Sequence, residues 1–161
     1  MGSAAAASDL ACQVTFHCRF VPALMRAKQL IERGVLGRVF HFRAAYLHAG
    51  YTDPARPMSW RLDKEQSGGG ALFDLGAHVV DVVRYLLGDV RRVHGSLRTF
   101  IAERPAPDGS GPRPVEVDDL ALMQVEMNDG SVGLVEASRL ATGSNDQLRI
   151  EIHGQKGALQ F

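Results

Sequence analysis

Apolar residues recur at spacings of three and four between positions 72 and 86, which is the period of one face of an α-helix. These residues are Leu72, Leu75, Val79, Val82 and Leu86. Three glycines at 68–70 precede the segment, and Gly88 follows it. Because glycine loses the most backbone freedom in regular structure and favours the position just after a helix, the pattern predicts a helix over 71–87 that Gly88 closes.

A second set of residues with the same period is polar. It consists of Asp74, His78, Asp81 and Tyr85. Residues three and four apart lie above one another on a helix, so these groups are expected to form a stripe. A carboxylate one turn before an imidazole can accept its ring N–H, and an imidazole held in this way can exchange a proton with a hydroxyl. The same spacing also fits surface pairs or satisfied buried groups, so the stripe is only a candidate site.

The first third of the chain predicts a short helix between two strands. Residues 13–20 are rich in β-branched and aromatic side chains, which favours a strand, and Pro22 suits the first turn of a helix. The buried face of that helix is expected to comprise Leu24, Ala27 and Ile31, with Gly34 at its end. Residues 39–48 predict the second strand, with one face formed by Phe40, Phe42, Ala44 and Tyr46. His41 and His48 are expected to be ordinary exposed strand residues.

Two stretches predict loops. Residues 50–66 contain two prolines and lack any periodicity. Because loops on a rigid scaffold often carry binding residues, Trp60 and Arg61 are candidates for contacting a substrate, although a core Trp60 and a surface Arg61 fit equally well. Residues 103–114 are rich in proline and glycine, which predicts a mobile loop.

The second half of the chain predicts a succession of strands. They are expected at residues 90–101, 120–127, 132–138, 147–153 and 158–161. Asn128-Asp129-Gly130 is a strong hairpin signal. Strands that follow helices favour an α+β fold, here a largely antiparallel, open-faced sheet with helices on one face. Pairing of sheets between subunits, giving a homo-oligomer, is a fair expectation from the apolar alternation on several strands.

The composition is that of a soluble globular protein, with 45% apolar and 22% charged residues. The 18 basic and 18 acidic residues cancel. An extended nucleic-acid or anionic-membrane surface would need clustered positive charge, so neither partner is expected. No apolar run approaches the length of about 18 residues that a membrane-spanning helix needs.

The 161 residues fit one domain. Residues 1–11 are interpreted as a disordered leader, and residues 12–161 as a domain truncated at both ends, because its last strand stops at Phe161. Cys12 and Cys18 would lie too far apart along a strand to form a disulfide. They are interpreted as free thiols, which fits a cytoplasmic protein.

Metal-dependent chemistry is a weaker interpretation of the polar stripe. Zinc sites use at least three protein ligands, and the sequence places no third candidate close to Asp74, His78 or Asp81. A metal-dependent isomerase or hydrolase is therefore the poorer alternative, and no metal is expected.

Two segments together carry a family resemblance. They read RFVPALMRAKQLIERGVLGRVFHFRAAYLH and PMSWRLDKEQSGGGALFDLGAHVVDVVRYLLGD. The most specific part is the pattern W-R…G-G-G…D-x-G-x-H-x-x-D, from Trp60 to Asp81. From about Val14 to its end, the chain resembles the C-terminal part of the Gfo/Idh/MocA oxidoreductases.

The resemblance implies a two-domain enzyme. An N-terminal Rossmann domain would bind NAD or NADP, and the C-terminal α+β domain would supply the substrate wall and the oligomer interface. Hydride would move between a sugar or polyol carbon and the nicotinamide. The family's catalytic pair carries onto His78, as the acid/base group, and Asp74, as its orienting or hydroxyl-binding partner. Substrate binding is assigned to Arg61, Trp60 and Asp81.

The chain departs from the family pattern in its nucleotide-binding features. It contains no G-x-G-x-x-G, so the turn that cradles a pyrophosphate is missing, and the family's E-K-P lysine has no counterpart. NAD or NADP is therefore expected in a parent enzyme but not on this chain, which should be inactive by itself. The alternative is a non-catalytic binding or scaffold module that retains the fold.

Overall fold

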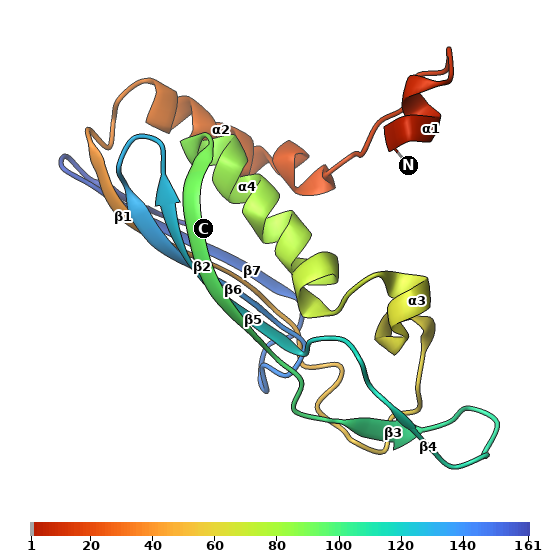
Figure 1. Ribbon diagram of the computed structural model, residues 1–161. Coiled ribbons are helices and arrows are strands. Elements are labelled where there is room, and N and C mark those ends of the chain that lie inside the picture. Colours follow the sequence, from red (N-terminus) through yellow and green to blue (C-terminus); the bar gives the residue numbers. More distant parts are fainter. Residues whose placement is uncertain (1) are drawn as a thin grey trace.

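The computed structural model describes residues 2–161, and its centre is a six-stranded sheet (Figure 1). The strand order is β2 (Val90–Arg98), β5 (Leu120–Met127), β6 (Val132–Ser138), β1 (Val39–Leu47), β7 (Gln147–Gly154) and β8 (Ala158–Gln160). β1 and β6 pair in parallel, and the other neighbours are antiparallel. The predicted α+β class with a largely antiparallel sheet is confirmed.

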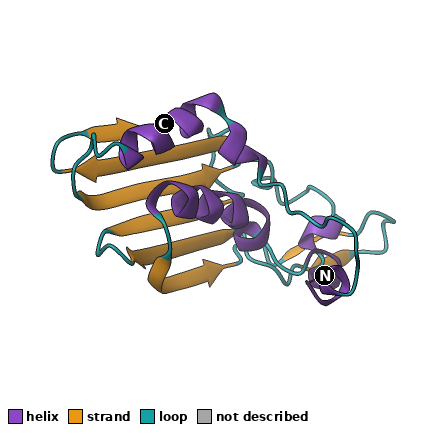
Figure 2. Ribbon diagram, turned by 90° about the horizontal axis from the view of Figure 1, so that it is seen from above, coloured by secondary structure: helices purple, strands orange, loops and turns teal. Residues whose placement is uncertain are grey.

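Two helices cover one face of this sheet, as Figure 2 shows. They are α2 (Pro22–Glu32) and α4 (Ala77–Leu87), and α4 continues directly from a π-helical turn, η3 (Leu72–Gly76). Their apolar faces pack against the inner side chains of the strands. The core includes Leu24, Ala27, Val79, Val82 and Leu86 from the helices, and Phe42, Ala44, Val125, Met127, Val135, Ile150 and Ile152 from the sheet. The predicted inner faces of both helices are therefore confirmed.

The apolar face predicted for β1 is wrong at Phe40, its first residue. The pairing of β1 with β7 shifts between Val39 and His41, which marks a bulge. As a result Val39 takes the buried position and Phe40 is 50% exposed, although alternation placed Phe40 beside Phe42. Periodicity alone carries no signal for an inserted residue, because the alternation resumes after it.

The predicted strand over residues 13–20 is also wrong. Residues 11–16 have no regular structure, and His17–Phe20 form a short 3₁₀ helix, η1. Phe16 before it has a left-handed backbone, with φ of 42°. The N–H of Arg19 donates to the oxygen of Phe16, and that of Val21 to the oxygen of Cys18. This segment satisfies backbone groups locally because no neighbouring strand pairs with it.

The stretch 103–114 is a second small sheet and not an irregular loop. β3 (Glu103–Pro105) and β4 (Pro112–Pro114) form a hairpin that extends from one end of the main sheet (Figure 1). Arg104 is 1% exposed and donates to the backbone oxygens of Tyr51 and Asp53. A buried guanidinium therefore ties the hairpin to the loop after β1, an anchor that composition could not indicate.

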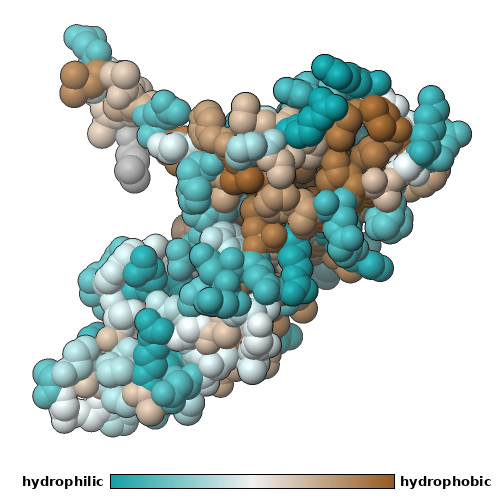
Figure 3. Space-filling view, turned by 180° about the vertical axis from the view of Figure 1, so that it is seen from behind, coloured by the Kyte–Doolittle hydropathy of each residue, from teal (hydrophilic) through white to brown (hydrophobic). Residues whose placement is uncertain are grey.

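The remaining elements are short. α1 (Gly2–Ala6) lies apart from the sheet in Figure 1 and has no buried residue; η2 (Trp60–Leu62) and α3 (Lys64–Ser67) lie near the hairpin. Apolar side chains gather over the sheet-and-helix part of the surface seen in Figure 3, whereas the hairpin end is more hydrophilic. Within residues 2–161, every helix is too short or too polar to cross a bilayer.

Candidate functional site

A pocket of 310 Å³ opens where β1 and β6 end beside the start of α4. Its lining consists of Tyr46, His48, Tyr51, Arg56, Arg61, Asp74, Leu75, His78, Arg139 and Asp146. Three of the residues predicted for the site, Arg61, Asp74 and His78, are therefore brought together. The other two, Trp60 and Asp81, are not among the lining residues.

The parallel pairing of β1 with β6 builds one wall of the pocket. Parallel strands deliver their carboxyl ends to the same edge of a sheet. Tyr46 lies opposite Ala137 in this register, and the N–H of His48 donates to the oxygen of Ser138 at 2.8 Å. His48 and Arg139, the residues that follow β1 and β6, therefore lie side by side. The sequence predicts His48 to be an ordinary exposed strand residue, whereas in the structure it lines the pocket.

The π-helical turn builds the opposite wall, and Gly70 sets its position. A Cβ atom on Gly70 would lie 2.0 Å from the backbone oxygen of Asp118. The Asp118 carboxylate accepts from the N–H of Gly70 at 3.0 Å and of Leu72 at 2.7 Å, so it caps the start of the turn. Here the glycine permits close approach of another backbone. π-Turns within helices are frequent at functional sites.

Asp74 contacts two arginines rather than the histidine. Its Oδ2 lies 3.1 Å from Nη2 of Arg139 and 3.8 Å from Nε of Arg61. Arg139 is 1% exposed and also donates to the backbone oxygen of Arg61 at 3.2 Å. No hydrogen bond joins Asp74 to His78 among the described residues. Of the two roles expected for Asp74, orienting His78 through the ring N–H lacks its hydrogen bond here, because the buried guanidinium of Arg139 is the stronger partner. Binding a substrate hydroxyl stays a prediction.

His78 is left with an unpartnered nitrogen. Its Nδ1 is buried, and no described residue offers it a hydrogen bond. Three rings meet the imidazole edge to face, those of Phe16, His17 and Tyr46, with centroids 6.1, 5.3 and 6.0 Å away. A partly buried imidazole without a fixed partner is free to bind or exchange a proton with a ligand.

Tyr46 and Asp146 stand on the same side of the pocket. Burial, followed by the hydrogen bond to Asp146, raises the pKa of Tyr46 to about 12. The phenol is therefore neutral at physiological pH and acts as a hydrogen-bond donor. Asp146 has a φ of 60°, which is unusual for a residue other than glycine and marks a constrained turn.

Asp81 and Trp60 have other structural partners. Asp81 is 7% exposed and pairs bidentately with Arg19, at 2.8 Å to Nε and 2.5 Å to Nη2. This ion pair ties η1 to α4. Trp60 is 53% exposed, and the Arg61 guanidinium lies 4.4 Å from its ring centroid. The structure thus places neither residue where the other members of the predicted site meet.

Several pocket residues were missed by sequence reasoning. They are Tyr46, His48, Tyr51, Arg56, Arg139 and Asp146. Arg139 directly follows one predicted strand and His48 is the last residue of another, and these positions are the available signal. It becomes informative only once the two strands are known to be parallel neighbours, because antiparallel strands would send these residues to opposite ends.

A family model described as the GFO/IDH/MocA C-terminal domain matches residues 24–160. The chain belongs to this family.

Relatives of this GFO/IDH/MocA domain include dehydrogenases of small carbohydrates. The levoglucosan dehydrogenase of Pseudarthrobacter phenanthrenivorans is 41% identical over 160 residues, covering 92% of this chain and 41% of that protein. The scyllo-inositol 2-dehydrogenase (NAD(+)) of Bacillus subtilis is 33% identical, covering 92% and 39%. A solved structure of levoglucosan dehydrogenase in complex with NADH and L-sorbose has a TM-score of 0.94 at 41% identity, covering 100% and 43%. The chain spans about two fifths of the length of these relatives.

The pocket of this GFO/IDH/MocA domain is suited to a ligand with several hydroxyl groups. The carboxylates of Asp74 and Asp146 and the phenol oxygen of Tyr46 can accept hydrogen bonds, and the guanidinium of Arg61 can donate them. His78 can do either. Polar groups that converge from several sides in this way fix the orientation of a small ligand.

Proposed function

We propose that this chain is the substrate-binding domain of an NAD(P)-dependent oxidoreductase that transfers hydride between a sugar or polyol carbon and nicotinamide. The observation that carries the proposal is the convergence of His78, Asp74 and Arg61 on one pocket. The dehydrogenase names of relatives that are 41% and 33% identical support the same chemistry. The activity belongs to the longer protein of which such a domain forms about two fifths.

Each residue has a defined part in this proposal. His78 accepts the proton of the reacting hydroxyl during oxidation and returns it during reduction. Asp74, held by Arg139, accepts a hydrogen bond from a neighbouring hydroxyl, and Arg61 donates to a substrate oxygen. The Tyr46 oxygen, whose proton is donated to Asp146, accepts a hydrogen bond from the β1 side. Trp60 is left out because it does not line the pocket, and Asp81 because it pairs with Arg19.

The nicotinamide cofactor, when bound, accepts or supplies the hydride. The described residues do not fit its pyrophosphate, because no glycine-rich turn links a strand to a helix within residues 2–161. We infer that the remainder of the longer protein holds the nucleotide, and that this chain alone neither binds NADH tightly nor turns over substrate. Fluorescence titration of NADH with the chain tests this inference, and micromolar binding would contradict it.

Steady-state kinetics of the full-length protein test the role of His78. We expect His78→Ala to lower kcat by about 10²- to 10⁴-fold, the usual contribution of an acid/base group. His41→Ala is the matched control, because His41 is an exposed histidine on β1 that points to the other side of the sheet. An unchanged kcat in the His78 variant removes this residue from the mechanism. A full reading frame without any nucleotide-binding segment would instead favour the scaffold alternative.

We also propose that the open face of the sheet pairs with a second copy of the chain. Leu122 and Leu134 on this face are 45% and 58% exposed, and they line a 540 Å³ groove. An exposed apolar groove of this kind is typical of an interface. Sedimentation analysis is expected to show an oligomer that Leu134→Glu dissociates. A wild-type monomer at high concentration rejects the proposal.

A further inference from the structure

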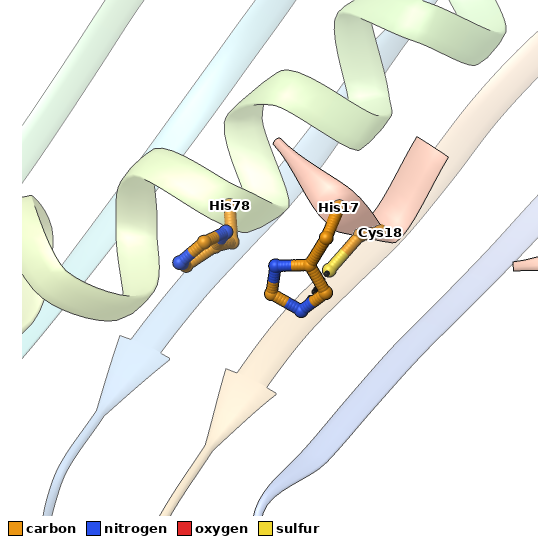
Figure 4. Close-up of side chains that lie close together, drawn as sticks. All are labelled: His17, Cys18 and His78. Atoms are coloured by element: carbon orange, nitrogen blue, oxygen red, sulfur yellow. Dashed lines mark hydrogen bonds between the residues drawn. The ribbon is translucent and has the colours of Figure 1, made fainter. Parts of the chain in front are cut away.

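A thiol and two imidazoles meet beside the start of α4, on segments about 60 residues apart in the sequence. They belong to His17 and Cys18 in η1 and to His78 in α4 (Figure 4). One nitrogen of each ring and the sulfur all lie within 4.8 Å of one another. Sequence spacing indicates no third ligand for His78, because η1 approaches α4 only in the folded chain. There the Arg19–Asp81 ion pair joins η1 to α4.

The separation of these atoms is close to what a metal ion requires. Zinc bound at about 2.3 Å to sulfur and 2.0–2.1 Å to nitrogen in a tetrahedron leaves its ligands about 3.3–3.6 Å apart. Sγ of Cys18 and Nε2 of His17 are 3.7 Å apart. No separation in the cluster exceeds 4.8 Å, so the widest has to contract by about 1.5 Å at most. The exposed His17 ring has the freedom to make that movement.

The surroundings carry negative charge, which favours a cation. The carboxylates of Asp81 and Asp146 both act electrostatically on Cys18. The same carboxylates stabilise a divalent cation at this position, offset in part by Arg19, which neutralises Asp81. The buried Nδ1 of His78 also lacks any partner, and a metal ion would satisfy it.

We propose that His17, Cys18 and His78 form a binding site for a thiophilic divalent transition metal ion, with Zn²⁺ as the best match. Three protein ligands leave a fourth position for water or another small ligand. On binding, the Cys18 S–H bond breaks, the sulfur bonds the metal and one proton leaves to solvent. The ion also occupies a lone pair of His78, so that nitrogen can no longer take up a proton. The site shares His78 with the proposed dehydrogenase, but metal binding can be measured without that activity.

Cobalt titration of the reduced, metal-free chain provides the test. Co²⁺ is a spectroscopic substitute for Zn²⁺, and a thiolate ligand gives it a charge-transfer band in the near ultraviolet. We expect one equivalent to bind with this band, one proton to be released, and Zn²⁺ to displace the cobalt with a Kd of about 1 μM or lower. No thiolate band, or binding only at millimolar metal, overturns the proposal.

Matched variants assign the ligands. Cys18→Ser should abolish the band, and Cys12→Ser, which changes the exposed cysteine, should leave it unchanged. His17→Asn should raise the Kd at least about tenfold, since losing a ligand costs more than losing an outer-shell partner. Because His17 is exposed, this variant should keep its fold. A band that survives Cys18→Ser refutes the assignment. Loss of binding only in His41→Asn, a variant of the stacked His41–His153 pair, refutes it as well.

Discussion

Replacing Arg139 with methionine tests whether a buried cation holds Asp74 in the pocket. The guanidinium is 1% exposed, lies 3.1 Å from the Asp74 carboxylate and donates to the backbone oxygen of Arg61. Breaking a fully buried ion pair costs about 3–5 kcal/mol. Asp74 is 39% exposed, so solvent screens part of this interaction. We therefore expect Arg139→Met to destabilise the fold by about 2 kcal/mol.

A double-mutant cycle separates the ion pair from the packing of the long side chain. Urea unfolding followed by circular dichroism is measured for Arg139→Met, Asp74→Asn and the double variant. Groups in direct contact show coupling of about 0.5–3 kcal/mol, and we expect about 1 kcal/mol here. The exposed Arg84–Asp89 pair, at 2.7 Å, is the control, and Arg84→Met should change stability by less than about 0.5 kcal/mol. Additive effects at Arg139 and Asp74 would refute the reasoning.

Two further predictions concern the same walls of the pocket. Gly70→Ala should destabilise the chain far more than Gly69→Ala. The methyl group added at Gly70 would clash with the backbone of Asp118, which is fixed. The methyl group added at Gly69 would contact the ring of Phe73, which is 62% exposed and can move. Equal urea midpoints for these variants would contradict this. Tyr46 has a raised pKa, so its contribution to stability is complete below about pH 10 and is lost as pH rises towards about 12. Unfolding midpoints between pH 9 and 12 should therefore fall more steeply for wild type than for Tyr46→Phe.

The helices and most strands could be predicted because their period is set by local packing. Val79, Val82 and Leu86 are fully or almost fully buried, as the three-and-four spacing indicates. Gly88, with φ of 92°, follows α4 at the expected position. The Asn128-Asp129-Gly130 turn likewise joins β5 to β6, where Gly130 has φ of 84°. In each case residues close in sequence determine the outcome.

The errors arise where partners distant in sequence decide the structure. Residues 103–114 form an anchored hairpin because the Arg104 side chain reaches the loop after β1. Residues 13–20 form no strand, because no neighbouring strand pairs with them. Cys18 instead packs into the core, and the Arg19–Asp81 ion pair holds this segment against α4. Composition and alternation contain no information on either contact, because both depend on which surfaces meet after the sheet has formed.

The pocket illustrates the same principle at the level of chemistry. The helical stripe indicated Asp74 and His78, which both line the pocket, but their partners come from the ends of β1 and β6 and from η1. Asp74 meets Arg139, and His78 meets Tyr46, His17 and Cys18. The parallel pairing of β1 with β6 is what brings Tyr46 and Arg139 to one edge. Because Arg139 pairs with Asp74, His78 has no carboxylate partner and can bind either a proton or a metal ion. A proton and a metal ion would therefore compete for one nitrogen of His78.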